Sequence, residues 1–258
     1  MTDPLQSQWL EPSRLVENCD ALRDHFRFDD RIADWANAYE RGHLDHYRSI
    51  LERVRRALSL SPGRRVLEVG AVPGHIPALL KHAGLDVTVV DLDPSRSATL
   101  FDALDIPAHA ADIERDPLPL PDDSMDLVLF CEVLEHLRLN PLFAIEEVCR
   151  VLRPGGLCLL STPQITPLMR WDFLRGVDYQ GDLVAEFAKL ETIGHMGHFR
   201  IYSEREVLRM AEHAGLGLVE RSAGGKQSGA NRGWVAGMLR RLRPAAMRTQ
   251  IHLLLTPQ

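Results

Sequence analysis

RVLEVGAVPG, residues 65–74, is the stretch of sequence that decides the fold. Its first half, 65–69, is a short apolar run typical of a buried strand; Gly70 ends this run, and Gly74 directly precedes a helical pattern over 75–82. The pattern predicts a strand, a tight loop and a helix. Such loops lie at the carboxyl ends of strands in open α/β sheets, where ligands bind, and glycine lets the backbone approach a ligand closely. A turn without any ligand would produce the same pattern.

A second strand, 86–90, ends at an acidic residue, Asp91. A carboxylate placed after the strand that follows a glycine loop can accept hydrogen bonds from two ribose hydroxyls. The alternative is an acid that stabilises a helix N-terminus through the helix dipole. Asp93, which is followed by Pro94 and Ser95, fits that alternative better than Asp91 does.

Four segments in a fixed order and spacing carry a family resemblance across roughly residues 64–163. They are VLEVGAVPG (66–74), VVDLDP (89–94), ADIERDPLPLPDDSMDLVLFCEVLEHL (111–137) and EEVCRVLRPGGLCLLSTP (146–163). In these segments the chain resembles a class I S-adenosylmethionine-dependent methyltransferase. The resemblance implies an α/β fold, with a Rossmann-like, doubly wound, seven-stranded and mostly parallel sheet that has helices on both faces.

The flanking parts match the family only in general organisation. We expect residues 1–60 to form an N-terminal helical arm or cap and residues 61–258 to form the methyltransferase domain. Within that domain, the position of residues 164–200 after the fifth strand implies a lid or substrate insertion. Before the first strand, residues 43–58 carry apolar side chains three and four positions apart, which predicts an amphipathic helix.

The resemblance also implies a set of cofactor contacts. Glu68 would lie near the amino end of the methionine moiety, where an acid suits an ammonium group. Asp91 would bind the ribose, Leu92 would lie against the adenine, and Asp112 would accept from the adenine amino group, unless it is a solvent-facing loop carboxylate. The complete implied set is Glu68, Gly70, Ala71, Gly74, Asp91, Leu92, Asp112, Ile113 and Cys131.

The glycine loop departs from the family's acid-x-Gly-x-Gly-x-Gly pattern. Val72 replaces the central glycine, and Pro73 precedes the last one. Proline fixes its own φ and disfavours helical geometry at the preceding residue. Two consequences stay open, namely a reshaped loop and weakened binding of the cofactor.

Three residues after the fourth strand are the candidates for acid–base work. Glu132, Glu135 and His136 follow the strand whose carboxyl end, in the family, is where the acceptor meets the methyl group. A histidine has a reference pKa near neutrality and suits a hydroxyl or amine that loses a proton. The alternative is a supporting histidine without a chemical role, because many family members work mainly by positioning their substrates.

The helices before the first strand supply candidate substrate contacts, because helices at this position often cover the active site in the family. Tyr39 and His43 are the main candidates, with Trp35 and His46 beside them. The alternative is that Trp35 and Tyr39 only pack these helices on the sheet.

A second group of candidate substrate residues, His195, His198 and Arg200, lies in GHMGHFRIYS within and just after the insertion. A structural loop is the alternative for this group. A His-x-x-His pair on a glycine-containing loop lacks a third well-spaced ligand, so we expect no metal site here.

The composition of the chain indicates which partners and which cellular setting to expect. A net charge of −6 argues against a broad nucleic-acid surface, and the four cysteines form no C-x-x-C pair, which is typical of a reducing, cytoplasmic setting. The sequence has no run of about 18 apolar residues, so we expect no membrane span. We therefore expect a small molecule, O- or N-methylated, as the acceptor, with no nucleic-acid or membrane partner. No sequence feature indicates the oligomeric state.

Three other functions stay open. One is a protein or nucleic-acid methyltransferase, although residues 130–133 read FCEV and lack the Asn/Asp-Pro-Pro-Tyr/Phe tetrad of base-amine methyltransferases. Another is a catalytically inactive methyltransferase-like binding module, which the substitution at Val72 favours. A Rossmann dehydrogenase is disfavoured because the loop lacks G-x-G-x-x-G.

Overall fold

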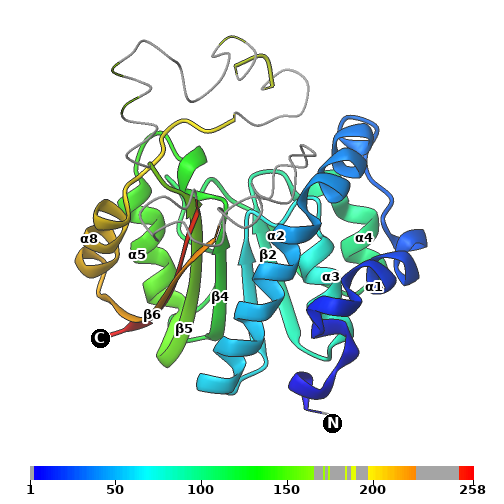
Figure 1. Cartoon of the computed structure of the whole chain (residues 1–258), viewed down its shortest axis with the longest axis horizontal. Coiled ribbons are helices and arrows are strands. Elements are labelled where there is room, and N and C mark those ends of the chain that lie inside the picture. Colours follow the sequence, from blue (N-terminus) through cyan, green and yellow to red (C-terminus); the bar gives the residue numbers. More distant parts are fainter. Residues whose placement is uncertain are drawn as a thin grey trace, which may run out of the picture.

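One sheet of seven strands, in the order β3-β2-β1-β4-β5-β7-β6, organises the described part of the chain (Figure 1). The computed structural model describes residues 3–165, 171, 174, 184, 187–189, 197–224 and 250–258. The strands are β1 (Arg65–Val69), β2 (Asp86–Asp91), β3 (Ala108–Ala110), β4 (Met125–Cys131), β5 (Leu152–Pro163), β6 (Leu216–Gly224) and β7 (Gln250–Pro257). β1 to β5 pair in parallel, whereas β7 runs antiparallel to both β5 and β6. The predicted seven-stranded, mostly parallel, doubly wound Rossmann-like sheet is confirmed.

The strand order reverses between β1 and β4, which is the feature that positions the site. From β1 the chain builds outward to β2 and β3, and it then returns to place β4 on the other side of β1. The two strands pair in register up to Val69 and Phe130, so their carboxyl ends lie side by side. Such a reversal leaves a crevice outside the strand ends, because the loops that follow the two strands turn away in opposite directions.

Helices cover both faces of the sheet, and each face has its own hydrophobic core. The helices are α1 (Leu15–Ala21), α2 (Ala33–Leu60), α3 (His75–His82), α4 (Ala98–Ala103), α5 (Pro141–Val151) and α8 (Glu204–His213). Buried side chains of α1, α2, α3 and α4 pack in one core, and those of α5 and α8 pack in the other (Figure 1). The two-sided cover explains why β4 is buried along almost its whole length.

The helix α2 is longer than its sequence pattern indicates. Separate helical patterns over 29–40 and 43–58 predict two helices, whereas the structure has one continuous helix, Ala33–Leu60, that runs through Gly42. Glycine within a helix costs about 1 kcal/mol relative to alanine. The packing of Tyr47, Leu51 and Val54 against the sheet supplies buried apolar area that offsets this cost.

The boundaries of the N-terminal cap and of the insertion stay predictions. α1 and α2 share a core with the sheet rather than forming a core of their own. Most of residues 164–200, including His195, lies outside the described residues. Among the residues that are described, none of the helices is both long enough and apolar enough to cross a membrane.

Candidate cofactor and substrate site

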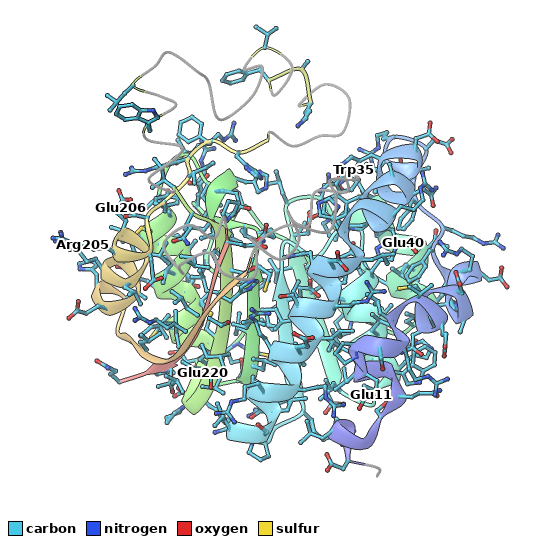
Figure 2. The ribbon with its side chains drawn as sticks, in the orientation of Figure 1. Glu11, Trp35, Glu40, Arg205, Glu206 and Glu220 are labelled. Carbon is cyan, nitrogen blue, oxygen red and sulfur yellow. The ribbon has the colours of Figure 1, made fainter. Side chains whose placement is uncertain are left out.

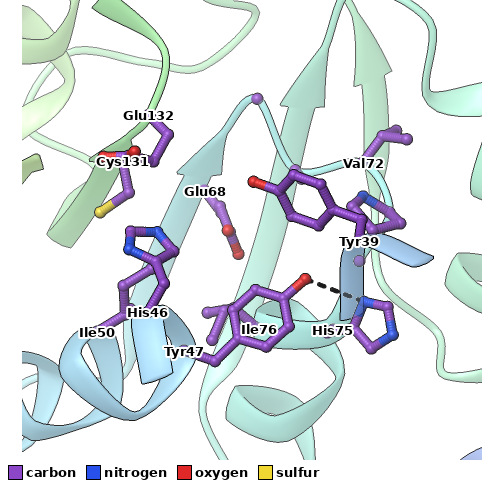
Figure 3. Close-up of a pocket in the computed structure, with 14 residues that line it drawn as sticks. Tyr39, His46, Tyr47, Ile50, Glu68, Val72, His75, Ile76, Cys131 and Glu132 are labelled. Carbon is purple, nitrogen blue, oxygen red and sulfur yellow. Dashed lines mark hydrogen bonds between the residues drawn. The ribbon is translucent and has the colours of Figure 1, made fainter. Parts of the chain in front are cut away.

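A cleft opens at the carboxyl ends of β1 and β4, where the strand order reverses (Figure 3). It holds about 370 Å³ of empty space, counting the part open to solvent. The glycine loop, α2, the start of α3 and the end of β4 contribute its walls. The lining residues are Tyr39, His46, Tyr47, Ile50, Glu68, Gly70, Ala71, Val72, Pro73, Gly74, His75, Ile76, Cys131 and Glu132.

The loop after β1 needs glycine at two positions. Gly70 has a φ of +74°, and a Cβ there would lie 2.6 Å from Cγ2 of Val133. Gly74 has a φ of +98°, and a Cβ there would lie 2.5 Å from Cδ2 of Leu100. Both conformations favour glycine, and both glycines also let the loop pack closely on its neighbours. The two predicted loop glycines and Ala71 therefore lie along the cleft, as a cofactor-binding loop requires.

Glu68 is a buried carboxylate in the cleft. Figure 3 shows its side chain among the rings of Tyr39, His46 and Tyr47. Its Oε2 has no hydrogen-bond partner among the described residues, and burial, with Asp91 nearby, raises its pKa well above the usual range. A buried oxygen without a donor fits the ammonium group of an amino-acid ligand, such as the methionine part of S-adenosylmethionine.

Asp91 is buried at the end of β2, and its carboxylate already has three donors. Its Oδ1 accepts from the backbone N–H of Asp93 at 3.0 Å and from Arg96 at 2.9 Å, while Oδ2 accepts from the N–H of Val72 at 3.1 Å. A carboxylate has about four acceptor positions. Three of these positions are taken, so one remains for the two ribose hydroxyls. Ribose binding at Asp91 therefore requires Arg96 to share or release this carboxylate.

The predicted adenine contacts lie along the ends of β2 and β3. Leu92 is an exposed apolar side chain, 56% accessible, which suits a wall for an aromatic ring. Ile113 is half-buried and packs against the core that contains the buried side chains of α5 and α8. Asp112 is half-buried, and its Oδ1 accepts from the N–H of Glu114 at 3.2 Å, so this carboxylate also shapes its own loop.

The end of β4 brings two predicted site residues to the cleft. Cys131 is half-buried and lines the cleft, and burial raises the pKa of its thiol. Glu132 follows in a left-handed conformation, with a φ of +56°, and its Oε1 accepts from the hydroxyl of Ser161 at 3.0 Å. A non-glycine residue with positive φ costs about 1–2 kcal/mol, and such strain is found most often at functional sites.

The turn after β4 also holds the other two candidate acid–base residues. Glu135 is fully buried, and its Oε2 accepts from the hydroxyl of Thr162 at 2.9 Å. His136 bonds through Nδ1 to the carbonyl oxygen of Gly197 at 3.1 Å. His198 comes close as well, with Nε2 at 3.9 Å from Oε1 of Glu135. The structure thus brings together Glu135, His136 and His198, which the sequence assigned to two separate groups.

The α2 residues form an aromatic wall beside the cleft. Tyr39 lines the cleft and stacks on His43, with ring centroids 3.7 Å apart, and His43 bonds through Nδ1 to the carbonyl oxygen of Tyr39. Burial raises the pKa of the Tyr39 hydroxyl, and Glu132, Glu135 and Glu68 raise it further. Tyr39 therefore stays neutral and faces an acidic environment.

Arg200 lies in a different environment. Its side chain is exposed, pairs with Glu206 at 2.8 Å near the start of α8 and lies over the ring of Tyr202. Figure 2 labels Glu206 on this helix. It is not among the residues that line the cleft. Its assignment to the substrate stays a prediction, as does that of His195, which lies outside the described residues.

A buried polar chain under the cleft was missed by the sequence analysis. Tyr47 lies 3.4 Å from Nδ1 of His75, Nε2 of His75 lies 3.3 Å from Glu40, and Arg23 donates to Glu40 at 2.8 Å (Figures 2 and 3). The bonds from His75 and Arg23 lower the pKa of Glu40 to about 2. Tyr47 looked like one member of an apolar stripe. The position of His75 directly after the last loop glycine was the only available signal.

The comparisons with known proteins agree with this geometry. The profile of a family described as Methyltransferase domain matches residues 41–221. An uncharacterized methyltransferase of Mycobacterium bovis is 38% identical over 120 residues, which are 46% of each chain. A protein of Mycolicibacterium smegmatis, named a probable S-adenosylmethionine-dependent methyltransferase, is 39% identical over 39% of this chain and 38% of its own. The chain thus spans less than half the length of these relatives.

Solved structures share the fold. An S-adenosylmethionine-dependent methyltransferase from Thermotoga maritima superposes with a TM-score of 0.57 over 88% of this chain and 99% of its own, at 19% identity. The family match covers well over half of the sequence, so the chain belongs to this methyltransferase-domain family.

Proposed function

We propose that this protein transfers the methyl group of S-adenosylmethionine to an oxygen or nitrogen atom of a small-molecule acceptor. One observation carries the proposal, namely a cleft at the β1/β4 reversal that is lined by a buried acid, Glu68, and by Glu132, the first acid–base candidate of the β4 turn. Such a cleft can hold a charged, elongated cofactor and leave its reactive centre facing an acceptor.

Glu68, which lines the cleft, and residues at the ends of β2 and β3, which do not line it, fit S-adenosylmethionine. Glu68 would hold the ammonium group, Asp91 the ribose hydroxyls, and Leu92, Asp112 and Ile113 the adenine. When bound, S-adenosylmethionine supplies a methyl group that is already activated by its sulfonium. The protein therefore has to align the acceptor atom with the methyl carbon and exclude water from the cleft.

The acceptor end of the cleft offers a route for the proton that the acceptor loses. Glu132 lines the cleft, and Glu135 and His136 follow it in the same turn. The stacked rings of Tyr39 and His43 supply an aromatic wall for the acceptor. Among the described residues the cleft measures about 370 Å³, a size typical of small-molecule sites, which favours a small molecule over a folded protein or a nucleic-acid strand as the acceptor.

The competing functions are a protein or nucleic-acid methyltransferase and an inactive binding module. An assay of product formation separates them. The purified protein is incubated with methyl-labelled S-adenosylmethionine and with three kinds of acceptor, namely pools of small hydroxy and amino compounds, an unrelated protein mixture, and total RNA.

We expect label only in small molecules. We also expect His136→Gln to lower turnover at least tenfold while leaving the affinity for S-adenosylhomocysteine unchanged, because His136 lies at the acceptor end. Label in the protein or RNA fraction would contradict the proposed acceptor class. Binding of the cofactor without transfer to any acceptor would favour the binding module.

A further inference from the structure

Three potential metal ligands from two distant parts of the sequence meet beside the cleft. Glu135 and His136 belong to the short turn after β4, and His198 belongs to the segment that leads into α8. One donor atom from each residue lies within 4.8 Å of the other two. The rings of His136 and His198 are 5.2 Å apart between centroids and lie edge to face.

Backbone hydrogen bonds fix this meeting point. The N–H groups of Phe199 and Arg200 both donate to the carbonyl oxygen of Glu135, at 2.7 and 3.1 Å. The segment that carries His198 is therefore attached to the turn that carries the other two side chains. The main chain therefore holds the two segments together, and the side-chain rotamers set the distances between the donor atoms.

The two residues of the turn are oriented as metal ligands usually are. A carbonyl oxygen only accepts, so the bond from His136 to Gly197 puts a proton on Nδ1 and leaves the lone pair of the neutral ring on Nε2. The hydroxyl of Thr162 donates to Oε2 of Glu135 and holds that carboxylate in place. Metal-binding histidines typically donate their second ring N–H to a carbonyl or carboxylate, and ligating carboxylates are themselves hydrogen-bonded.

The charge balance points in the same direction. Glu135 is 0% exposed. Glu132, Glu135 and Glu68 all lie close enough to Tyr39 to raise the pKa of its hydroxyl, so three acids share this region. His198 approaches Glu135 only to 3.9 Å, which exceeds a hydrogen-bond distance. A cation between these side chains would offset the negative charge of the buried carboxylate.

We propose that Glu135, His136 and His198 bind one divalent first-row transition-metal ion at the carboxyl end of β4. Two imidazoles and one carboxylate suit zinc, manganese, iron or cobalt better than magnesium or calcium, which prefer oxygen ligands. Ligands at about 2.1 Å from an ion lie about 3–3.5 Å apart, so donor atoms that lie up to 4.8 Å apart have to close by as much as about 1.3–1.8 Å, which side-chain rotation can provide.

The ion deepens the proposed function, on which this part of the inference rests. Three protein ligands leave coordination positions open, as in catalytic metal sites. Those positions would bind an oxygen of the acceptor and lower the pKa of an acceptor hydroxyl, which favours O-methylation over N-methylation. His136 and Glu135 then act on the acceptor through the ion, and Glu132, which lines the cleft, remains as a candidate base.

The test is a titration of the metal-free full chain with Mn²⁺, in which binding is measured as the loss of the free-ion signal in electron paramagnetic resonance. A second titration, with Zn²⁺, is measured by calorimetry. We expect one Mn²⁺ per chain, with binding at least tenfold weaker in His198→Gln and in Glu135→Gln. His213→Gln is the matched control, since it removes an exposed histidine that also lies near a glutamate, 3.7 Å from Glu146. This control should bind as the parent does.

Several results would overturn the metal site. They are no ion bound by the folded parent, equal binding by His198→Gln, or equal weakening in His213→Gln. Because Glu135 is buried and its variant could fail to fold, the partly exposed His198 keeps the test decisive. A parallel titration with S-adenosylhomocysteine separates the two proposals. A protein that binds this product but no metal refutes only the metal site, and one that binds metal but not the product refutes only the proposed function.

Discussion

Asp91 shows how one residue serves both the fold and the site. Its carboxylate forms a buried ion pair with Arg96, in which each side chain is less than a tenth exposed, and it also accepts a bond from the glycine loop at Val72. The same carboxylate is the predicted ribose acceptor. The predicted ribose contact would therefore couple cofactor binding to the internal structure of the loop through a single side chain.

Replacement of Asp91 tests this double role. Asp91→Asn should weaken binding of S-adenosylhomocysteine by about 1.5–3 kcal/mol, roughly 10- to 150-fold, because a charge-assisted hydrogen bond is lost. It should also lower the midpoint of thermal unfolding, since Arg96 then lies buried without its charged partner. Asp93→Asn, at a more exposed neighbouring acid, should leave affinity unchanged. Equal affinity of folded Asp91→Asn and the parent would remove the ribose assignment.

The sequence could predict Asp91 but not its partner. An acid at the end of the second strand stands out from the pattern alone. Arg96 lies five residues later and returns to Asp91 only because the short turn at Pro94–Ser97 reverses the chain. Side-chain pairs of this kind depend on loop geometry, which residue spacing does not determine.

At the scale of elements, the turn after β4 carries the predicted acid–base residues. Glu132 leaves the strand in a left-handed conformation, and this bend lets Glu135 and His136 turn back toward the strand end. The segment at 197–200 then binds this turn through the main chain of Glu135. These two pieces are more than 60 residues apart, so sequence spacing paired His198 only with His195, whereas the fold places Glu135 and His136 beside His198.

The left-handed conformation of Glu132 has a measurable consequence. Glu132→Gly and Glu132→Ala both lose the bond from Ser161, but only glycine accepts a positive φ without strain. The glycine variant should therefore have a free energy of unfolding about 1 kcal/mol higher than the alanine variant. At Glu146, on α5, the same two substitutions should give the opposite order by about 1 kcal/mol, because glycine is unfavourable within a helix. A more stable alanine variant at Glu132 would contradict the left-handed backbone.

At the scale of the whole molecule, most of the fold was predictable. Alternating strand and helical patterns and the loop at 65–74 indicate a parallel sheet with a ligand cleft, and the family resemblance supplies the seven-stranded, doubly wound architecture. The polar chain under the cleft was not predictable, because Tyr47, His75 and Glu40 lie on two helices, and packing sets which sides of these helices face each other. The same holds for α2, whose two sequence patterns join into one helix through Gly42.

The predicted contact between Glu68 and the ammonium group can be tested through the proton that Glu68 carries. Burial raises its pKa well above the ordinary carboxyl value, so the cofactor-free protein retains a proton there as the pH rises above that ordinary value. An ammonium group beside Glu68 favours the carboxylate form and lowers its pKa. Binding should therefore release a proton, and affinity should rise with pH between the ordinary and the raised pKa.

The most direct measurement of the central claim is a calorimetric titration of the full chain with S-adenosylhomocysteine, repeated in two buffers of different ionisation enthalpy. We predict one site per chain and a release of protons that Glu68→Gln abolishes. Folded protein that binds neither S-adenosylhomocysteine nor S-adenosylmethionine would contradict the claim that this cleft is the cofactor site. Binding with the same proton release in Glu68→Gln would show that Glu68 does not hold the ammonium group.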